Sequence, residues 1–242
     1  MAGTALVEVT RGGRVESRHL GSLVVADAAG RIVFSLGDRD LAAFPRSAVK
    51  ALQALPLIES GAADKYGLDQ AEIALACASH SGKTAHVASA AAMLAKAGRG
   101  VADLECGAHW PMAEAAQRQL AREGREPSAL HNNCSGKHAG FVCLACAGGV
   151  DPAGYVGVDH PVQRQVRRAL EETTGTSLDP AAAGIDGCST PTWAIPLVAL
   201  ARAFARLGSG EGFSRTRAQA AERIRAACAR HPHMVAGSGR FD

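Results

Sequence analysis

The sequence is poor in aromatic residues and in lysine, and neither sign of charge dominates it. Phe, Trp and Tyr make up 4% of the 242 residues, whereas Ala alone supplies 50. An interior built mostly from small side chains favours closely packed helices, so we expect helices to predominate. The formal net charge is only +3, and 21 of the 26 basic residues are scattered arginines. A nucleic-acid-binding surface is usually more basic and more clustered, which excludes nucleic acid as a partner.

Long hydrophobic runs are also missing. No segment approaches the roughly 20 apolar residues that span a bilayer. The first residues, MAGTALVEVTRGG, lack the basic start and the apolar core of a signal peptide. We therefore predict a cytoplasmic protein with no membrane partner.

The cysteines do not form the pattern of a disulfide-stabilised protein. There are seven, an odd number, and a cytoplasmic chain is kept reduced. Cys143 and Cys146 lie in the apolar stretch FVCLACA, with no second pair at metal-binding spacing nearby. We expect these two, and also Cys77, Cys106 and Cys228, to act as small buried hydrophobic residues.

Strand-like segments come first in the chain and helical segments follow. Residues 5–36 alternate polar and apolar side chains in short runs separated by turn residues, which predicts an antiparallel meander. From Pro45 onward the apolar spacing is helical. We expect helices over about 45–60, 69–78, 84–98, 111–123, 136–148, 160–174, 193–207 and 214–230.

This segregation predicts an α+β fold, with helices packed on an antiparallel sheet, in a single domain over 1–242. The last residues, MVAGSGRFD, stop on turn-like residues without a closing element. We therefore expect the sheet to lack C-terminal strands and to present an unpaired edge.

The segment FPRSAVK contains a possible nucleophile and base. Pro45 marks a helix start, and the spacing of three places Ser47 and Lys50 on one helix face. A serine hydroxyl needs a base to become nucleophilic, and a lysine one turn away can serve if its amine is kept neutral. The pattern also occurs as a solvated pair on ordinary helices, so the motif alone leaves both interpretations open.

A second polar cluster, ASHSGKT, follows an apolar run at a predicted break between helices. Ser79 either caps the next helix or takes part in catalysis. Gly82, Lys83 and Thr84 resemble the end of a phosphate-binding loop. Such a loop needs another glycine five positions before Gly82, where Cys77 stands, so we exclude it.

Two further loops, HNNCSGKH and IDGCSTPTW, each hold a cysteine among polar and small residues. Cys134 and His138 lie one helical turn apart, and Cys188 with Asp186 could complete a metal site. A disulfide between the two cysteines, or two free thiols, is the competing interpretation. The residues by themselves do not decide between them.

Six motifs occur in a fixed order over nearly the whole chain: PRSAVKALQ, CASHSGK, HNNCSGKHAGFV, DHPVQ, DGCSTPT and MVAGSGRFD. Together they resemble the Rhizobium etli-type L-asparaginases, whose fold is similar to that of serine β-lactamases and glutaminases. The resemblance implies hydrolysis of L-asparagine to L-aspartate and ammonia. It places Ser47 and Lys50 in the first catalytic segment and Ser79 in the second.

The resemblance also implies a zinc site at Cys134, Lys137 and Cys188, with Asp186 close to the metal-bound water. This ligand set differs from the one that spacing suggests, because it uses Lys137 in place of His138. Lysine is a rare ligand since its amine must be neutral, but a nearby cation can enforce that deprotonation.

Relatives of this type continue past the position of Asp242 through further strands, one of which carries a second catalytic lysine. We therefore expect this chain to hydrolyse asparagine slowly or not at all. Lys83 stands where an acidic residue is expected, and its charge would make the pocket more positive. Two outcomes are open: Lys83 depresses the pKa of Lys50, or its side chain is solvated. Substrate orientation is expected from Arg46, His131 and Asn133, since an amino acid presents both an ammonium and a carboxylate.

We expect a homodimer, with the unpaired sheet edge as a route to association. Two other functions remain open. An S-x-x-K hydrolase acting on a β-lactam or a peptide would share the chemistry. A catalytically impaired metal-binding fragment would keep only the cysteine loops.

Overall fold

The computed structural model describes residues 4–240. Phe241 and Asp242, the last two residues of the MVAGSGRFD motif, lie outside the described residues. Four predicted strands are present at the N-terminal end. They are β1 (Thr4–Arg11), β2 (Arg14–Gly21), β3 (Leu23–Ala26) and β4 (Ile32–Leu36).

The strands pair as two separate antiparallel hairpins, β1 with β2 and β3 with β4, so the prediction of one continuous meander is wrong. Only Ser22 separates β2 from β3. A single residue is too short to reverse the chain, since the tightest hairpins need two. Strand β3 therefore runs on from β2 instead of folding back beside it. Gly12 and Gly13, both at positive φ, form such a two-residue turn between β1 and β2.

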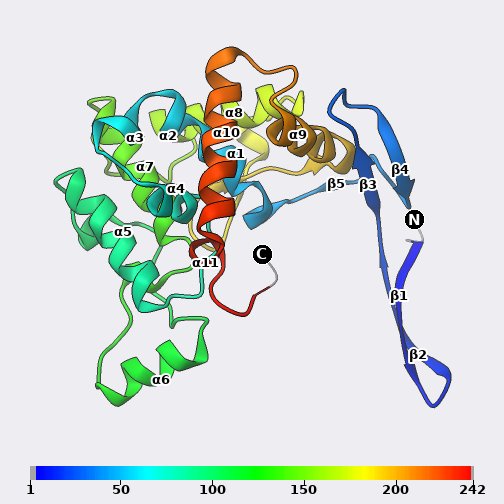
Figure 1. The fold of residues 1–242 in the computed structure, drawn as a ribbon, viewed down its shortest axis with the longest axis horizontal. Coiled ribbons are helices and arrows are strands. Elements are labelled where there is room, and N and C mark those ends of the chain that lie inside the picture. The colour runs from blue at the N-terminus through cyan, green and yellow to red at the C-terminus, as the bar shows by residue number, and fades with distance from the viewer. Residues whose placement is uncertain (1–3, 241–242) are drawn as a thin grey trace.

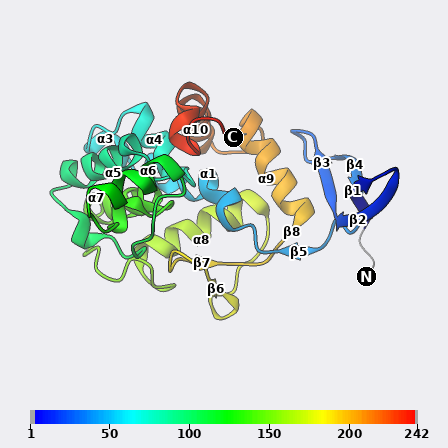
Figure 2. The same ribbon diagram turned by 90° about the horizontal axis from the view of Figure 1, so that it is seen from below.

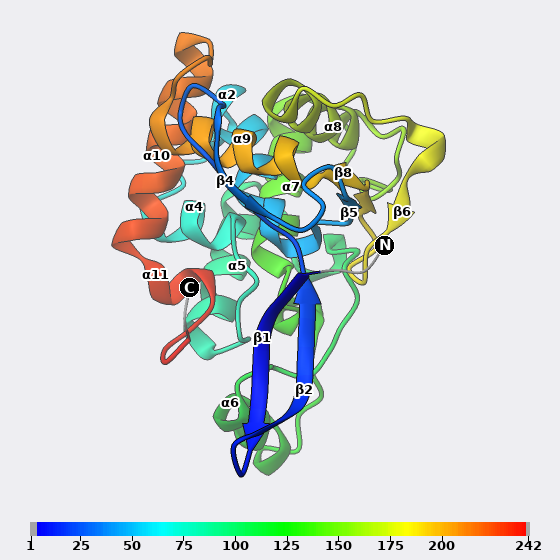
Figure 3. The same ribbon diagram turned by 90° about the vertical axis from the view of Figure 1, so that its right-hand side faces the viewer.

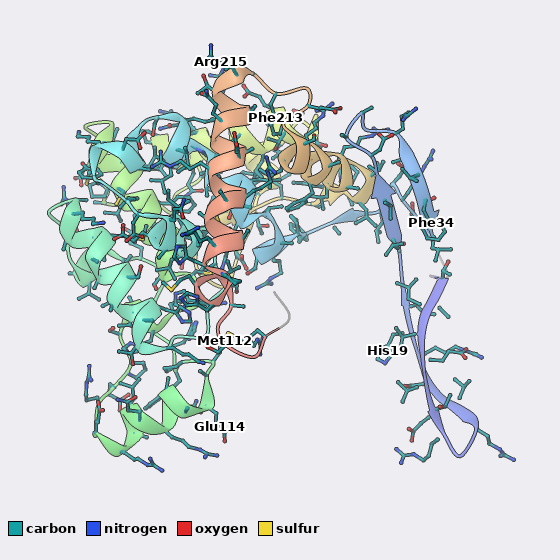
Figure 4. The ribbon with its side chains drawn as sticks, in the orientation of Figure 1. His19, Phe34, Met112, Glu114, Phe213 and Arg215 are labelled. Carbon is teal, nitrogen blue, oxygen red and sulfur yellow. The ribbon has the colours of Figure 1, made fainter. Side chains whose placement is uncertain are left out.

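Both hairpins lie at one end of the molecule, and the β1–β2 hairpin projects beyond the helices (Figures 1 and 3). His19 and Phe34 mark this end in Figure 4. Strand β3 packs against a helix, α9 (Leu197–Ser209), which lies between the strands and the other helices (Figure 2). A short pairing of β5 (Ala42–Ala43) with β8 (Ile195–Pro196) fastens the same junction.

The predicted helices are present with small shifts at their ends. In addition to α9, the α-helices are α1 (Lys50–Gln53), α2 (Leu55–Glu59), α3 (Ala62–Lys65), α4 (Gln70–Ala76), α5 (Thr84–Lys96), α6 (Glu114–Arg122), α7 (Ser135–Ala147), α8 (Pro161–Thr174), α10 (Arg215–Arg230) and α11 (Pro232–Val235). The segment predicted as one helix over 45–60 is broken. It begins as a 3₁₀ turn (Arg46–Val49) and is interrupted at Ala54, because Pro56 has no N–H for the helical ladder.

Helix α7 is the centre of the helical part. Every residue from Ser135 to Ala145 is buried, and α2, α3, α4, α5 and α8 surround the helix. A helix with no exposed face must lie in the core, so its polar residues need internal partners. Its close approach to α4 depends on Gly136, where a Cβ atom would lie 2.4 Å from both the side chain and the carbonyl oxygen of Leu75.

The architecture confirms the predicted α+β class, with small antiparallel sheets packed against helices. Within residues 4–240, no helix combines the length and the apolar character that a bilayer crossing requires.

Candidate active site and metal centre

Two serines from separate segments meet at one cavity. Ser47 lies in the 3₁₀ turn before α1, and Ser79 follows the end of α4. Their Oγ atoms are 3.3 Å apart, and both residues line a cavity of about 280 Å³. The Asn133 side chain donates from Nδ2 to Ser79 Oγ at 2.8 Å. Three polar groups far apart in the sequence are therefore joined in one hydrogen-bonded chain.

Lys50 is buried, with 1% of its surface exposed, and it is not among the residues that line this cavity. Its Nζ donates to the carbonyl oxygen of Ala78 at 2.6 Å, next to Ser79. Burial lowers the pKa of Lys50, the neighbouring thiol of Cys134 opposes this effect, and the neighbouring amine of Lys137 adds to it. Lys83 is not among the residues that line the serine cavity; it is the partly buried N-cap residue of α5.

A buried cluster of sulfur and nitrogen atoms adjoins Lys50. Cys134 stands just before α7 and Lys137 in its first turn, while Cys188 and Thr190 come from the loop between β6 (Gly184–Ile185) and β7 (Pro191–Thr192). Lys137 Nζ donates to Thr190 Oγ1 at 2.8 Å and to Cys188 Sγ at 3.1 Å.

The two thiols of this cluster interact, and their pKa values are shifted in opposite directions. A hydrogen bond with Cys134 holds the pKa of Cys188 far below its usual range. The same bond, together with burial, raises the pKa of Cys134. Cys188 is therefore the more acidic thiol of the pair, and it is the one that Lys137 Nζ contacts. Neither cysteine is in a disulfide. This removes the disulfide from the competing interpretation, whereas two free thiols are what the structure shows.

His138 is buried beside the cluster. Its Nδ1 is 2.6 Å from the Tyr155 hydroxyl, and its Nε2 has no hydrogen-bond partner within the described part of the chain. Burial lowers the pKa of His138 to about 4, so the ring is neutral. Among residues 4–240, no three His, Cys, Asp or Glu side chains are grouped closely enough to hold a metal ion. A three-ligand site here would need a donor of another type, and Lys137 is the one in contact.

A family model for L-asparaginase II matches residues 7–242. The chain belongs to the L-asparaginase II family. The match includes both clusters, and the Rhizobium etli type within the family stays a prediction. A comparison with curated proteins finds no match. Membership of the L-asparaginase II family implies an amidohydrolase.

The remaining predicted residues lie in different surroundings. Arg46 Nη2 forms an ion pair with Asp186 Oδ1 at 2.8 Å, and Arg46 has a positive φ of 48°. A non-glycine residue in that conformation is strained, and such strain is concentrated at functional sites. Asp186 also accepts the N–H of Gly187 and so braces the loop that holds Cys188.

His131 is not brought to the serine pair. Its Nδ1 accepts the backbone N–H of Ser128 at 3.0 Å, and its ring lines a separate cavity of about 130 Å³ with Gly82 and Pro111. Sequence reasoning did not select His109, which holds Asn133 in place. Its Nε2 accepts the Asn133 backbone N–H at 3.0 Å and lies 3.2 Å from Asn133 Oδ1. No local sequence motif predicts the contact between His109 and Asn133, because it joins two loops that are separate in the sequence.

Proposed function

We propose that this chain hydrolyses the side-chain amide of L-asparagine to L-aspartate and ammonia, with Ser47, Ser79 and Lys50 as the catalytic residues. The observation that carries the proposal is the contact between the two serine hydroxyls on a cavity wall, with the buried amine of Lys50 bonded to the carbonyl oxygen of Ala78, the residue before Ser79. Family membership supports the class of reaction.

The chemistry follows the usual path of covalent amide hydrolysis. One serine Oγ forms a bond to the amide carbon as its proton passes, directly or through the other serine, to neutral Lys50. Lys50 then gives that proton to the amide nitrogen, the C–N bond breaks, and ammonia leaves an acyl-enzyme. Water attacks the ester carbon while Lys50 accepts its proton, and the serine is regenerated. Burial of Lys50 supports this role because it favours the neutral amine.

Substrate orientation is proposed for Arg46 and Asn133. Asn133 reaches Ser79 Oγ directly, and Arg46 presents an exposed guanidinium paired with Asp186. Such a pair offers partners for the carboxylate and the ammonium of an amino acid. His131 lines a different cavity, so we assign it no contact with substrate.

Zinc is proposed as the cofactor, held by Cys134, Lys137 and Cys188. Two thiol groups in a buried cluster suit Zn²⁺, and the amine of Lys137 would be a third donor once the metal keeps it neutral. A bound zinc ion would supply positive charge that compensates the buried thiolates and holds the two loops together. Asp186 lies two residues before Cys188 and accepts the N–H of Gly187, so we propose that it lies close to the metal-bound water.

Association into a homodimer is proposed through the outer edges of the two hairpins. The β1–β4 hairpins expose large apolar side chains, among them Val7, Leu20, Val33 and Phe34. A second copy can pair with such an edge by the same hydrogen bonds and cover these side chains. Light scattering after size exclusion should give twice the chain mass, and the mass of a single chain would contradict the dimer.

The seven free thiols support a reducing compartment such as the cytoplasm.

The test is ammonia release from L-asparagine, run beside nitrocefin cleavage. We expect ammonia release that is lost in Ser47→Ala, Ser79→Ala and Lys50→Met, and retained in Ser17→Ala, a control on the exposed strand β2. Nitrocefin cleavage without ammonia release would favour an S-x-x-K hydrolase acting on β-lactams. Metal binding without either activity would favour the metal-binding fragment.

A further inference from the structure

Two cysteines outside the proposed metal centre share the serine cavity. Cys77 is the C-cap of α4, and Cys228 lies in the last turns of α10. Both line the cavity that holds Ser47 and Ser79. The helices that carry them pack against each other. Cys77 is buried, as the sequence predicts, whereas Cys228 is partly exposed.

The two thiols interact directly, and the interaction makes them unequal. A hydrogen bond between them lowers the pKa of Cys228 and raises the pKa of Cys77, which burial raises further. Cys228 is partly exposed, whereas Cys77 is buried. An accessible thiol with thiolate character beside a second thiol is the arrangement of a redox-sensitive cysteine and its resolving partner.

We propose that Cys77 and Cys228 are a thiol modification site, at which a peroxide joins them in a disulfide that obstructs the Ser47–Ser79 cavity. The co-reactant is hydrogen peroxide. The Cys228 sulfur attacks one peroxide oxygen, the O–O bond breaks, and the products are a sulfenic acid and water. The Cys77 sulfur then attacks the sulfenic sulfur, and a second water leaves as the S–S bond forms. Each peroxide is reduced by two electrons, and the two thiols are oxidised by two.

The effect on the cavity follows from what the two cysteines adjoin. The next residues after Cys77 are Ala78, which accepts the Lys50 hydrogen bond, and Ser79, whose N–H donates to Val235 of α11 at 3.0 Å. A disulfide fixes its sulfurs about 2.05 Å apart, closer than two separate thiols can lie. Bond formation would therefore pull the α10 wall toward the end of α4, across the cavity. This part of the inference rests on the proposed function.

The chain contains its own comparison pair. Cys143 and Cys146 are three residues apart on α7, and burial raises the pKa of Cys143 to about 12. The Cys143 thiol donates to the Met93 carbonyl oxygen at 3.4 Å. Because the Cys143 thiol is buried and donates to Met93 and not to Cys146, the same oxidant should not join this pair.

The experiment treats the full chain with hydrogen peroxide and maps non-reduced tryptic peptides by mass spectrometry. Cys77 lies in peptide 66–83 and Cys228 in peptide 226–230, whereas Cys143 and Cys146 share peptide 138–164. We expect 66–83 linked to 226–230, with release by dithiothreitol. A sulfenic acid confined to other cysteines, or no link under conditions that oxidise them, would overturn the modification site. This readout does not depend on any enzymatic activity.

Turnover tests the second part. Oxidation should reduce ammonia release in the wild type and in Cys146→Ser, and dithiothreitol should restore it. In Cys228→Ser and Cys77→Ser, the ratio of oxidised to reduced turnover should stay near one, whatever each variant's own rate. A complete cross-link with unchanged turnover would overturn the obstruction and leave the proposed function standing. A cross-link in a chain with no turnover before oxidation would count against the proposed function alone.

Discussion

At the scale of single residues, the orientation of Asn133 depends on His109. The Asn133 backbone N–H donates to His109 Nε2, so the His109 proton is on Nδ1, where it donates to the Trp110 carbonyl oxygen at 2.8 Å. This fixed ring holds the loop from which Asn133 Nδ2 reaches Ser79. His109 is thus a positioning residue without contact to the reacting atoms.

We predict that His109→Ala lowers kcat for asparagine about two- to tenfold, because one lost hydrogen bond costs about 0.5–1.5 kcal/mol. The measurement is steady-state ammonia release, with KM and kcat determined separately. His19→Ala, on the exposed strand β2 marked in Figure 4, is the matched control and should leave both unchanged. An equal kcat in His109→Ala and wild type would show that Asn133 needs no such support.

A second residue-scale prediction concerns pH and stability. His80 and His86 stack with ring centroids 4.9 Å apart, and burial lowers the pKa of each. In the unfolded chain a histidine titrates near 6.5. Below that pH the unfolded state binds protons that the folded state does not, so the free energy of unfolding falls as the pH falls. Each ring contributes up to about 1.4 kcal/mol per pH unit.

Urea denaturation at pH 7, 6 and 5 measures this dependence. His86→Asn keeps an acceptor where Nδ1 receives the Lys83 N–H, and it should lose stability less steeply than the wild type as the pH falls. His19→Ala should follow the wild-type slope. Parallel slopes in all three proteins would contradict the assignment of a neutral buried His86.

At the scale of secondary-structure elements, the contact between α4 and α7 is set by one glycine. A Cβ atom at Gly136 would meet Leu75, including its backbone, at 2.4 Å. We predict that Gly136→Ala destabilises the protein by about 1–3 kcal/mol, the usual cost of overpacking. Gly208→Ala in α9 is the control, since nothing lies within 4 Å of its Cβ position. It should stabilise by about 0.5–1 kcal/mol because Ala is the better helix former. Thermal unfolding of both variants checks the opposite signs.

The sequence predicted the helices well because their apolar spacing is regular. The same spacing could not show that β2 and β3 fail to pair, which depends on a connection of one residue. Short strands such as β5 and β8 are two residues each, too short for any periodic signal. At the site, the motifs anticipated which serines could act together. They could not reveal His109 or the Cys77–Cys228 pair, because those contacts exist only after distant segments pack.

At the scale of the whole molecule, the proposed zinc would tie the start of α7 to the β6–β7 loop. A ligand that binds only the folded state raises its stability by mass action. We predict that a chelator lowers the Tm of the zinc-loaded wild type by about 5–10 °C, for metal at roughly 100 times its Kd. Cys188→Ser should contain no stoichiometric zinc by elemental analysis and should not respond to the chelator. Cys143→Ser, a buried cysteine of α7 outside the cluster, should respond as the wild type does. Equal responses of the Cys188 variant and the wild type would place the metal elsewhere.

The central claim is that a serine of the Ser47–Ser79 pair becomes acylated, and acid-quenched mass spectrometry during turnover of L-asparagine tests it most directly. The account predicts an aspartyl ester on tryptic peptide 47–50 or on peptide 66–83, and on no other peptide. The peptide that carries it names the nucleophile, and substitution of that serine by alanine should abolish both the ester and ammonia release. Ammonia release at the wild-type rate from a chain in which both serines are alanine would contradict the account.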